Sequence, residues 1–172
     1  MEDYISDALK GDHRAFSYLY DQFAPAALRL SAAITRRQDL AEDAVQEAFL
    51  RAYRKGHQCT DPDRFRPWFF RIVINESRRI LRKNLGVTAL DADFPTPSFA
   101  EGSDRSLAIA EALDRLSPEH RSVLVLRFLL DLSEREISEI LKKPVGTVKS
   151  RIHYAKEALA QQLKEEERHD RS

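Results

Sequence analysis

The chain has 172 residues, 42% hydrophobic and 33% charged, with 28 basic and 28 acidic side chains and a single cysteine, Cys59. One cysteine excludes an internal disulfide framework and suits a reducing compartment. The N-terminal stretch lacks the apolar core of a secretion signal, and no uncharged apolar run approaches the ~18 residues of a membrane span. We therefore expect a cytoplasmic protein without direct membrane insertion.

The first half of the chain is predicted to be helical. A short helix over residues 2–10 precedes Asp12, which can cap the next helix. Apolar residues then recur at helical spacing over residues 16–34. Pro25 lies inside this stripe and is expected to kink or restart the helix. A third helix over residues 39–54 has a face of small and aromatic residues that should pack inward.

A second line of side chains on the third helix is acidic. It recurs at positions i, i+3, i+4 and i+7 and comprises Asp43, Gln46, Glu47 and Leu50. Acids around one leucine on an outer face suit docking on a basic partner. The alternative is a solvated face with one exposed leucine, and the pattern alone favours that alternative.

The most cationic part of the chain follows a predicted loop over residues 55–63. Residues 64–83 hold seven basic side chains and one acid, Glu76. A stripe at helical spacing comprises Arg71, Asn75, Arg78 and Arg82, with Arg79 and Lys83 beside it. Such a stripe, next to a polar loop and aromatic residues, suits a nucleic-acid strand with its bases pulled from the stack. For Trp68 and Phe69 themselves, core packing is the favoured interpretation.

Residues 84–105 are expected to form a flexible linker. No lysine or arginine occurs from Asn84 to Asp104, whereas glycine, proline and acidic residues are frequent there. The chain is therefore predicted to divide into an N-terminal domain, residues 1–83, and a C-terminal domain, residues 106–172.

The C-terminal domain is predicted to be organised around one apolar helix. Ser117, Pro118 and Glu119 provide a cap, a first-turn proline and a first-turn acid. Residues 123–130 are apolar almost all round, so this helix should be the centre of the domain. The charged tail that follows residue 159 is expected to fray.

Residues 132–159 are predicted to form two helices joined by a tight turn. Ser133 and Glu136 complete a capping box, and Pro144 suits the first position of the second helix. The second helix has an apolar face and a short, polar, cationic face. The polar face comprises Gly146, Thr147, Lys149, Ser150, Arg151, His153 and Tyr154. It suits a DNA major groove, although ordinary helical corners with basic outer faces share the pattern.

No catalytic or metal-binding constellation is found in the sequence. There is no phosphate-binding loop, no zinc-protease motif and no nucleophile elbow. His57 and Cys59 share a loop, but one cysteine cannot build a zinc knuckle. We therefore expect a binding protein rather than an enzyme, with no metal and no cofactor.

Three stretches together resemble the extracytoplasmic-function (ECF) sigma factors of bacterial RNA polymerase, over nearly the whole chain. They are DLAEDAVQEAFLRAY (39–53), FRPWFFRIVINESRRILRK (65–83) and LSEREISEILKKPVGTVKSRIHYAKEAL (132–159). The family implies an all-α protein with two small domains, sigma region 2 and sigma region 4. It also implies binding to core polymerase, recognition of the −10 and −35 promoter elements, and help in melting the DNA.

The resemblance assigns roles to the residues singled out above. The acidic face formed by Asp43, Gln46, Glu47 and Leu50 would dock on the clamp coiled coil of the β′ subunit, and the second domain would sit on the β flap. The loop would capture a flipped −10 base while the stripe holds the adjacent backbone. The implied −10 residues are His57, Gln58, Thr60, Arg64, Arg71, Asn75, Arg78, Arg79 and Arg82. The implied −35 residues are Lys149, Ser150, His153 and Tyr154, with Thr147 and Arg151 on phosphates.

Two departures from the family leave the promoter sequence open. His153 and Tyr154 replace a further arginine found in many members, and the loop sequence HQCTD is idiosyncratic. Members are commonly held inactive by an anti-sigma factor, which is therefore an expected partner. The main alternative is a stand-alone helix-turn-helix regulator of the response-regulator type, which would have no use for residues 39–83. A second alternative, a protein-only adaptor, should show no salt-dependent DNA binding.

Overall fold

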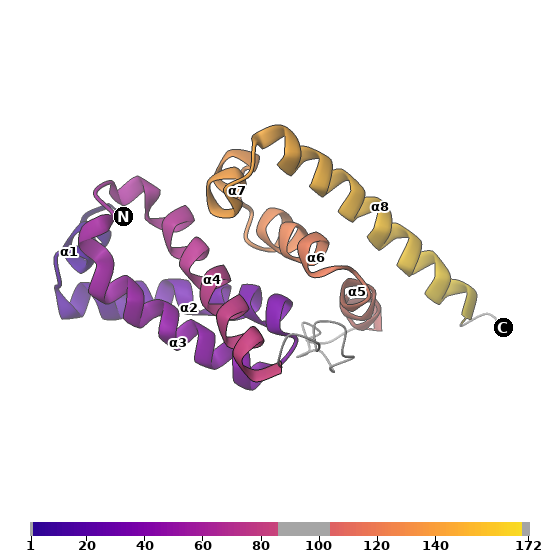
Figure 1. Cartoon of the computed structure of the whole chain (residues 1–172), viewed down its shortest axis with the longest axis horizontal. Helices are drawn as coiled ribbons and strands as arrows, with labels where there is room; N and C mark the ends of the chain where they lie inside the picture. The colour runs from indigo at the N-terminus through magenta and orange to yellow at the C-terminus, as the bar shows by residue number, and fades with distance from the viewer. Residues whose placement is uncertain (1, 86–103, 170–172) are drawn as a thin grey trace.

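The computed structural model describes residues 2–85 and 104–169, and all regular elements in these ranges are helical (Figure 1). The N-terminal helices are α1 (Glu2–Leu9), α2 (His13–Thr35), α3 (Gln38–Lys55) and α4 (Phe65–Leu85), with short 3-10 turns η1 (Gly56–Gln58) and η2 (Pro62–Arg64) before α4. The C-terminal elements are α5 (Asp104–Asp114), α6 (Pro118–Leu124), the π turn η4 (Val125–Leu129), α7 (Glu134–Leu141) and α8 (Val145–His169). The expected all-α class is confirmed. Most of the predicted linker, residues 86–103, lies outside the described residues.

The N-terminal bundle is formed by α1–α4. Asp12 caps α2, because its side chain accepts a hydrogen bond from the Ala15 amide at 2.8 Å. The predicted restart at Pro25 does not occur, since α2 continues through it. Proline removes only one hydrogen bond of the helix, and the packing of α2 against α3 and α4 holds the segments on both sides.

Aromatic side chains of α4 fill the centre of this bundle. Phe65, Phe69 and Phe70 are completely buried, and the Phe69 ring lies 4.7 Å from that of Phe49 on α3. Trp68, one position before Phe69, is only partly buried and faces the edge of the bundle. The core prediction is therefore confirmed for Phe69, whereas Trp68 borders a cavity.

The C-terminal bundle contains the predicted helix-turn-helix. Ser133 and Glu136 form the capping box at the start of α7, and Lys142 ends that helix in the left-handed conformation at φ 51°. The tail expected to fray is instead helical as far as His169. The apolar helix is buried over Val123–Leu126, but it widens into the π turn and leaves Phe128 and Leu129 exposed. The expectation of burial all round this helix was therefore wrong at its end.

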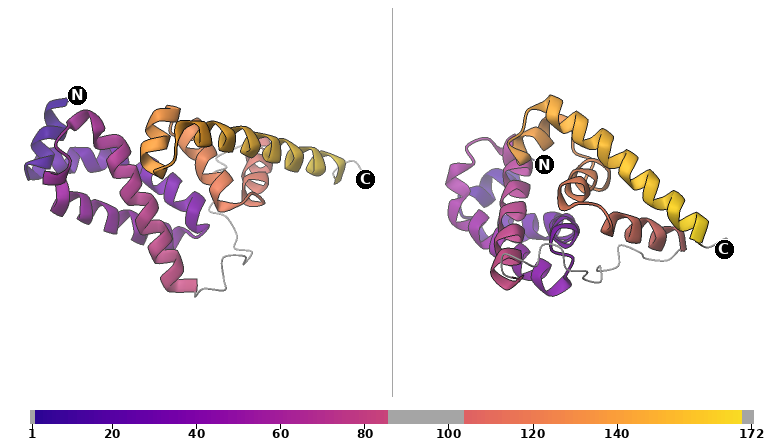
Figure 2. Two further views of the ribbon diagram at one scale, coloured as in Figure 1. Left: turned by 45° about the horizontal axis from the view of Figure 1, so that its top comes forward. Right: turned by 45° about the vertical axis from the view of Figure 1, so that its right-hand side comes forward.

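The two bundles pack directly against each other. Helix α6 contacts α2 and helix α7 contacts α4, so one hydrophobic cluster runs through both bundles (Figure 2). At the first contact Arg121 is buried and donates to the carbonyls of Ala33 at 3.1 Å and Leu116 at 2.9 Å. Burial lowers the pKa of Arg121 to about 10, with the Arg36 cation nearby adding to the effect and Asp114 opposing it. Arg121 therefore remains a buried cation at neutral pH; backbone oxygens accept from its two terminal nitrogens, whereas its buried Nε has no hydrogen-bond partner.

Candidate nucleic-acid interface

The loop before α4 is held in place by local contacts, so that its polar side chains point outward. A Cβ at Gly56 would lie 3.0 Å from the Leu9 carbonyl oxygen, so a larger residue here would require the end of α1 to shift by a few tenths of an ångström. The Asp61 side chain accepts from the Asp63 amide at 3.0 Å and caps η2. The predicted −10 residues of this loop, His57, Gln58 and Thr60, are all exposed.

Cys59 lies between these residues but is buried. Its thiol donates to the Asp61 carbonyl at 3.4 Å, and burial raises its pKa. The thiolate is the reactive form of a cysteine, and a raised pKa keeps Cys59 in the neutral thiol form. Cys59 therefore supports the loop structurally.

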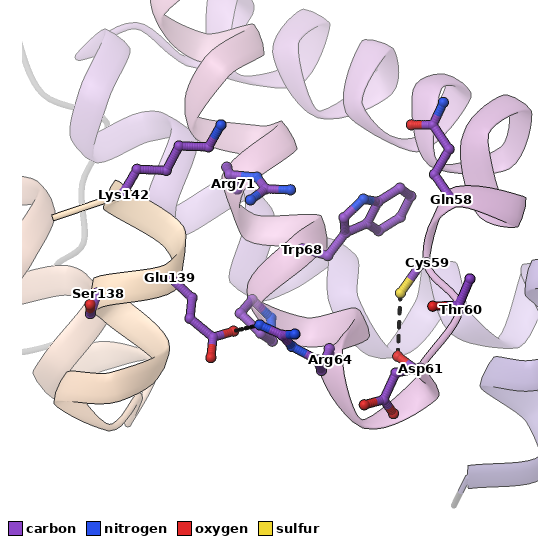
Figure 3. A pocket seen from close by; sticks show the side chains of 11 residues that line it. Gln58, Cys59, Thr60, Asp61, Arg64, Trp68, Arg71, Ser138, Glu139 and Lys142 are labelled. Carbon is purple, nitrogen blue, oxygen red and sulfur yellow. Dashed lines mark hydrogen bonds and ion pairs between the residues drawn. The ribbon is translucent and has the colours of Figure 1, made fainter. Parts of the chain in front are cut away.

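The loop and α4 form one wall of a cavity of about 650 Å³. Gln58 and Thr60 from the loop and Trp68 and Arg71 from α4 line this wall, as Figure 3 shows. The opposite wall belongs to α7 and comprises Ser138, Glu139 and Lys142. The sequence indicated that the loop and α4 residues lie together. It gave no indication that α7 of the helix-turn-helix would form the opposite wall.

Ion pairs join the two walls. Arg64 donates to Glu139 with an N–O distance of 3.1 Å, and this bond raises the pKa of the Arg64 guanidinium. Arg66 lies 3.9 Å from Glu136 and donates to the Leu130 carbonyl. Of the predicted −10 residues, Arg64 is thus engaged by α7 itself.

The cationic stripe on α4 is present, but its members differ in their surroundings. Asn75, Arg78 and Arg82 are exposed, and Arg71 is half-buried at the cavity. Among the described residues, Arg78 and Arg82 have no ion-pair partner. These two cations are consequently available for phosphates.

Arg79 differs from the rest of the stripe because two acids surround it. Its Nε donates to the Glu76 carboxylate at 2.7 Å, and its guanidinium lies 3.9 Å from Glu47. Glu76 is buried, and its other oxygen forms an ion pair with Arg51 of α3, whose Nε lies 2.8 Å away. Arg79 therefore belongs to a charged network that connects α3 with α4.

The outer face of α3 is mostly accessible. Asp43, Gln46 and Leu50 are exposed, whereas Glu47 is half-buried beside Arg79. Leu50 exposes 47% of its surface, and Gln46 and Glu47 precede it by one helical turn. The face is thus a small apolar contact point with an acidic border.

The polar face of α8 is exposed at Thr147, Lys149, Ser150, His153 and Tyr154, with Tyr154 exposing 60% of its surface. Contacts within α8 hold these side chains in place. The Ser150 hydroxyl donates to the Gly146 carbonyl at 3.1 Å, and the His153 and Tyr154 rings meet edge to face.

Two cations of α8 have acidic partners on other helices. Arg151 is half-buried and lies 3.4 Å from Glu119, and Lys149 lies 3.7 Å from Glu134. Both acids precede α8 by more than ten residues, so the spacing within the helix could not reveal them.

An apolar groove that sequence reasoning missed lies on the C-terminal bundle. Its volume is about 350 Å³, and its wall includes Ile109, Leu113, Phe128, Leu129 and Leu159. Phe128 exposes 59% of its surface and Leu129 exposes 44%. The sequence feature that could have revealed this groove is the apolar run over 123–130, because it has more apolar side chains than one buried helix face can hold.

In residues 2–85 and 104–169 there is no group of three or more histidine, cysteine or acidic side chains that could hold a metal ion. No helix in these ranges is both long and apolar enough to cross a membrane.

Comparison with known families matches both halves of the chain. Residues 19–85 match sigma-70 region 2, and residues 106–159 match sigma-70 region 4. The chain is 34% identical over 178 residues to the ECF RNA polymerase sigma factor SigW of Bacillus subtilis, covering 94% of this chain and 95% of SigW. It is 33% identical to the ECF sigma factor SigL of Mycobacterium tuberculosis, covering 94% of this chain and 96% of SigL.

Two solved structures are similar over both bundles. CnrH, in complex with the cytosolic domain of CnrY, aligns with a TM-score of 0.74 and 26% identity, covering 95% of this chain and 96% of CnrH. The sigma factor RpoE of Bartonella quintana, in complex with the anti-sigma factor NepR, gives the same TM-score and identity over 87% of this chain and 96% of RpoE.

Proposed function

Because the chain belongs to the ECF sigma factors of bacterial RNA polymerase, which direct transcription initiation, we propose that it reads one promoter with two separate surfaces. One observation carries this proposal: a cationic stripe beside a polar loop and an exposed helix-turn-helix occur in the same chain, on different bundles. The protein works by binding and has no chemical step of its own. Its place of action is the cytoplasm, where the polymerase is.

The loop and α4 would recognise the −10 element. Gln58 and Thr60 are exposed beside Trp68, so a base turned out of the duplex would find hydrogen-bonding groups and an aromatic edge together. Arg78 and Arg82 would hold the neighbouring phosphates, with His57, Arg64, Arg71 and Asn75 completing the surface. Flipping and unstacking cost a few kcal/mol per step, and these contacts offset that cost.

Arg79 is assigned a different role from its neighbours in this proposal. Glu76 and Glu47 already neutralise its charge, so a phosphate would have to displace one of them. Arg79 would instead fix α4 against α3, and only indirectly orient the stripe. Arg78, at the preceding position but without such partners, serves as its comparison.

The N-terminal part of α8 would enter the major groove at the −35 element. Ser150, His153 and Tyr154 are exposed and can reach base edges, and Lys149 lies beside them. Thr147 and Arg151 would contact phosphates, with Arg151 held in position by Glu119. Tethering makes the second of the two promoter contacts effectively intramolecular, which strengthens binding without further contacts.

Two surfaces away from the DNA would meet the polymerase. The acidic face of α3 with Leu50 at its centre suits the clamp coiled coil of β′, and the apolar groove beside Phe128 suits the flap of β. An exposed groove of this kind on a small domain is typical of a protein-binding site. An anti-sigma factor is a further proposed partner, because RpoE, to which this chain is similar, is bound to the anti-sigma factor NepR in its solved structure.

Reconstitution tests the proposal. The purified chain is added to bacterial core polymerase, and transcripts from genomic fragments are mapped by their start sites. We expect initiation at a restricted set of promoters that share −35 and −10 sequences. Binding of the chain alone to palindromic duplex DNA, without any effect on polymerase, would favour the response-regulator alternative and exclude the proposal.

A further inference from the structure

The cavity between the loop before α4 and helix α7 contains side chains that the proposed function uses only in part. Arg71 of α4 and Lys142 of α7 line it together with Trp68, Gln58 and Ser138. We propose that this cavity binds a small nucleoside phosphate, with the phosphate at the two cations and the base at Trp68. The site goes beyond the proposed function, because it includes side chains of α7 and needs neither promoter DNA nor polymerase.

Two cations from different helices supply the phosphate end of the site. In Figure 3 the Lys142 side chain extends toward Arg71. Within residues 2–85 and 104–169 neither side chain has an ion-pair partner. Because like charges repel each other, a phosphate between the two would relieve that repulsion and accept charged hydrogen bonds from both. Arg71 is half-buried, so water screens its charge less than it would on an open surface.

The acids that line the cavity are engaged by other groups. Glu139 binds Arg64 at 3.1 Å, and the Asp61 side chain accepts from the Asp63 amide at 3.0 Å. Three cations and two acids line the cavity in total, so it keeps an excess of positive charge. An anionic phosphate therefore suits the cavity better than a neutral or a cationic ligand.

Trp68 supplies the surface for the base. Its indole packs against the buried Phe65, with the ring centroids 5.9 Å apart, while the rest of the side chain borders the cavity. Proteins commonly hold an unpaired base by stacking it on an aromatic side chain. In Figure 3 the indole lies between Arg71 and Gln58, so a base at Trp68 would have its phosphate on the cationic side.

Polar side chains around the indole can bind the base edge and the sugar. Gln58 and Thr60 are exposed and line the cavity. A glutamine amide matches the N6 and N7 atoms of adenine with two hydrogen bonds, so an adenine nucleotide fits these groups. On the α7 side the Ser138 hydroxyl donates to the Lys143 carbonyl at 2.6 Å, so its oxygen can still accept from a ribose hydroxyl.

The size of the cavity favours a nucleotide over a simple anion. Its volume of about 650 Å³ lies within the range of roughly 300–1,000 Å³ that is typical of small-molecule sites. A single phosphate ion would contact Arg71 and Lys142 but would not reach across to Gln58 and the indole. A nucleoside monophosphate carries both groups, the anion and the planar base, that the two ends of the cavity can bind.

The fluorescence of Trp68 tests the proposal directly, because this residue is the only tryptophan of the chain. The full-length chain, without polymerase or DNA, is titrated with AMP while the tryptophan emission is followed. We expect a saturable change with a dissociation constant below about 1 mM. Adenosine lacks the phosphate and ribose phosphate lacks the base, so each should bind about tenfold more weakly than AMP in a calorimetric titration.

Lys142→Gln removes one of the two phosphate-binding cations and should weaken AMP binding about tenfold. Lys143→Gln is the matched control, since Lys143 is the next residue and is also exposed but does not line the cavity. It makes the same change in charge and should leave the affinity for AMP unchanged. Arg71→Gln removes the cation on the α4 side and should weaken AMP binding by a similar factor.

Three results would overturn the proposal: no saturable binding of AMP, equal affinities for AMP and ribose phosphate, or equal effects of Lys142→Gln and Lys143→Gln. Failure of the proposed function is a separate result, since it would appear as a lack of initiation with core polymerase, whereas AMP binding is measured on the free chain. Circular dichroism of every variant verifies that the helices are intact.

Discussion

Glu76→Gln is expected to destabilise the fold measurably, because Glu76 is a buried carboxylate between two arginines. Its Oε2 accepts a hydrogen bond from Arg79 Nε at 2.7 Å, and its Oε1 forms an ion pair with Arg51, whose Nε lies 2.8 Å away. Glutamine has nearly the same shape, but it carries no charge and offers only one acceptor. The variant therefore loses either the ion pair with Arg51 or the charged hydrogen bond from Arg79, and its NH₂ group faces one of the two guanidiniums.

The magnitude follows from the exposure of the partners. A hydrogen bond to a charged group contributes roughly 1.5–3 kcal/mol to stability. Arg51 and Arg79 expose 46% and 44% of their side chains, so either can turn toward water when its partner is lost. Removing the buried negative charge also relieves some desolvation. We therefore expect a loss of about 2 kcal/mol, toward the lower part of the range.

Thermal unfolding followed by circular dichroism provides the measurement. For a chain of this size, 1 kcal/mol shifts the melting temperature by roughly 2–4 °C, so Glu76→Gln should lower it by about 4–8 °C. Glu42→Gln is the control, because Glu42 is an exposed acid of α3, and it should change stability by less than about 0.5 kcal/mol. An unchanged or higher melting temperature for Glu76→Gln would refute the assignment of a stabilising network.

The remaining predictions concern separate surfaces. Arg78→Ala should reduce the salt slope of promoter binding by the holoenzyme by about 1, whereas Arg79→Ala should mainly lower the melting temperature; equal slopes for both variants would contradict the division of the stripe. Leu50→Asp should weaken binding to core polymerase in a pull-down titration while the melting temperature is retained, and unchanged affinity would remove α3 from the docking surface. Ser150→Ala and Tyr154→Ala should alter −35 preference by ~1–3 kcal/mol per lost base contact, measured on a promoter library; a uniform loss on all promoters would contradict base reading.

Features encoded within one helix or turn were predictable from the sequence. The capping box of Ser133 and Glu136, the cap at Asp12 and the helical stripe through Phe69 depend on residues a few positions apart. Local hydrogen bonds and periodic burial fix such features before any tertiary contact forms. At Pro25 a kink or a restart was expected, and only the restart is contradicted, because α2 continues through the proline and packs against other helices on both sides of it.

Features that depend on pairing between distant helices were not predictable. Glu76 counted as a single acid among seven cations, yet it forms an ion pair with Arg51 of another helix and removes Arg79 from the group of accessible cations. The contact of Glu139 with Arg64 joins residues that are 75 positions apart in the chain. A single sequence carries no signal for such partners, because either side chain could equally be solvated.

The zero net charge of the chain at first argues against nucleic-acid binding, but the total hides how the charges are distributed. Glu136 and Glu139 of α7 face Arg66 and Arg64, so these charges of opposite sign partly cancel. On the outer face of α4, Arg78 and Arg82 are exposed and have no acidic partner among the described residues. Phosphate binding depends on such a local positive surface and not on the sum over the chain. A chain without net charge can therefore still present the cations that a nucleic acid requires.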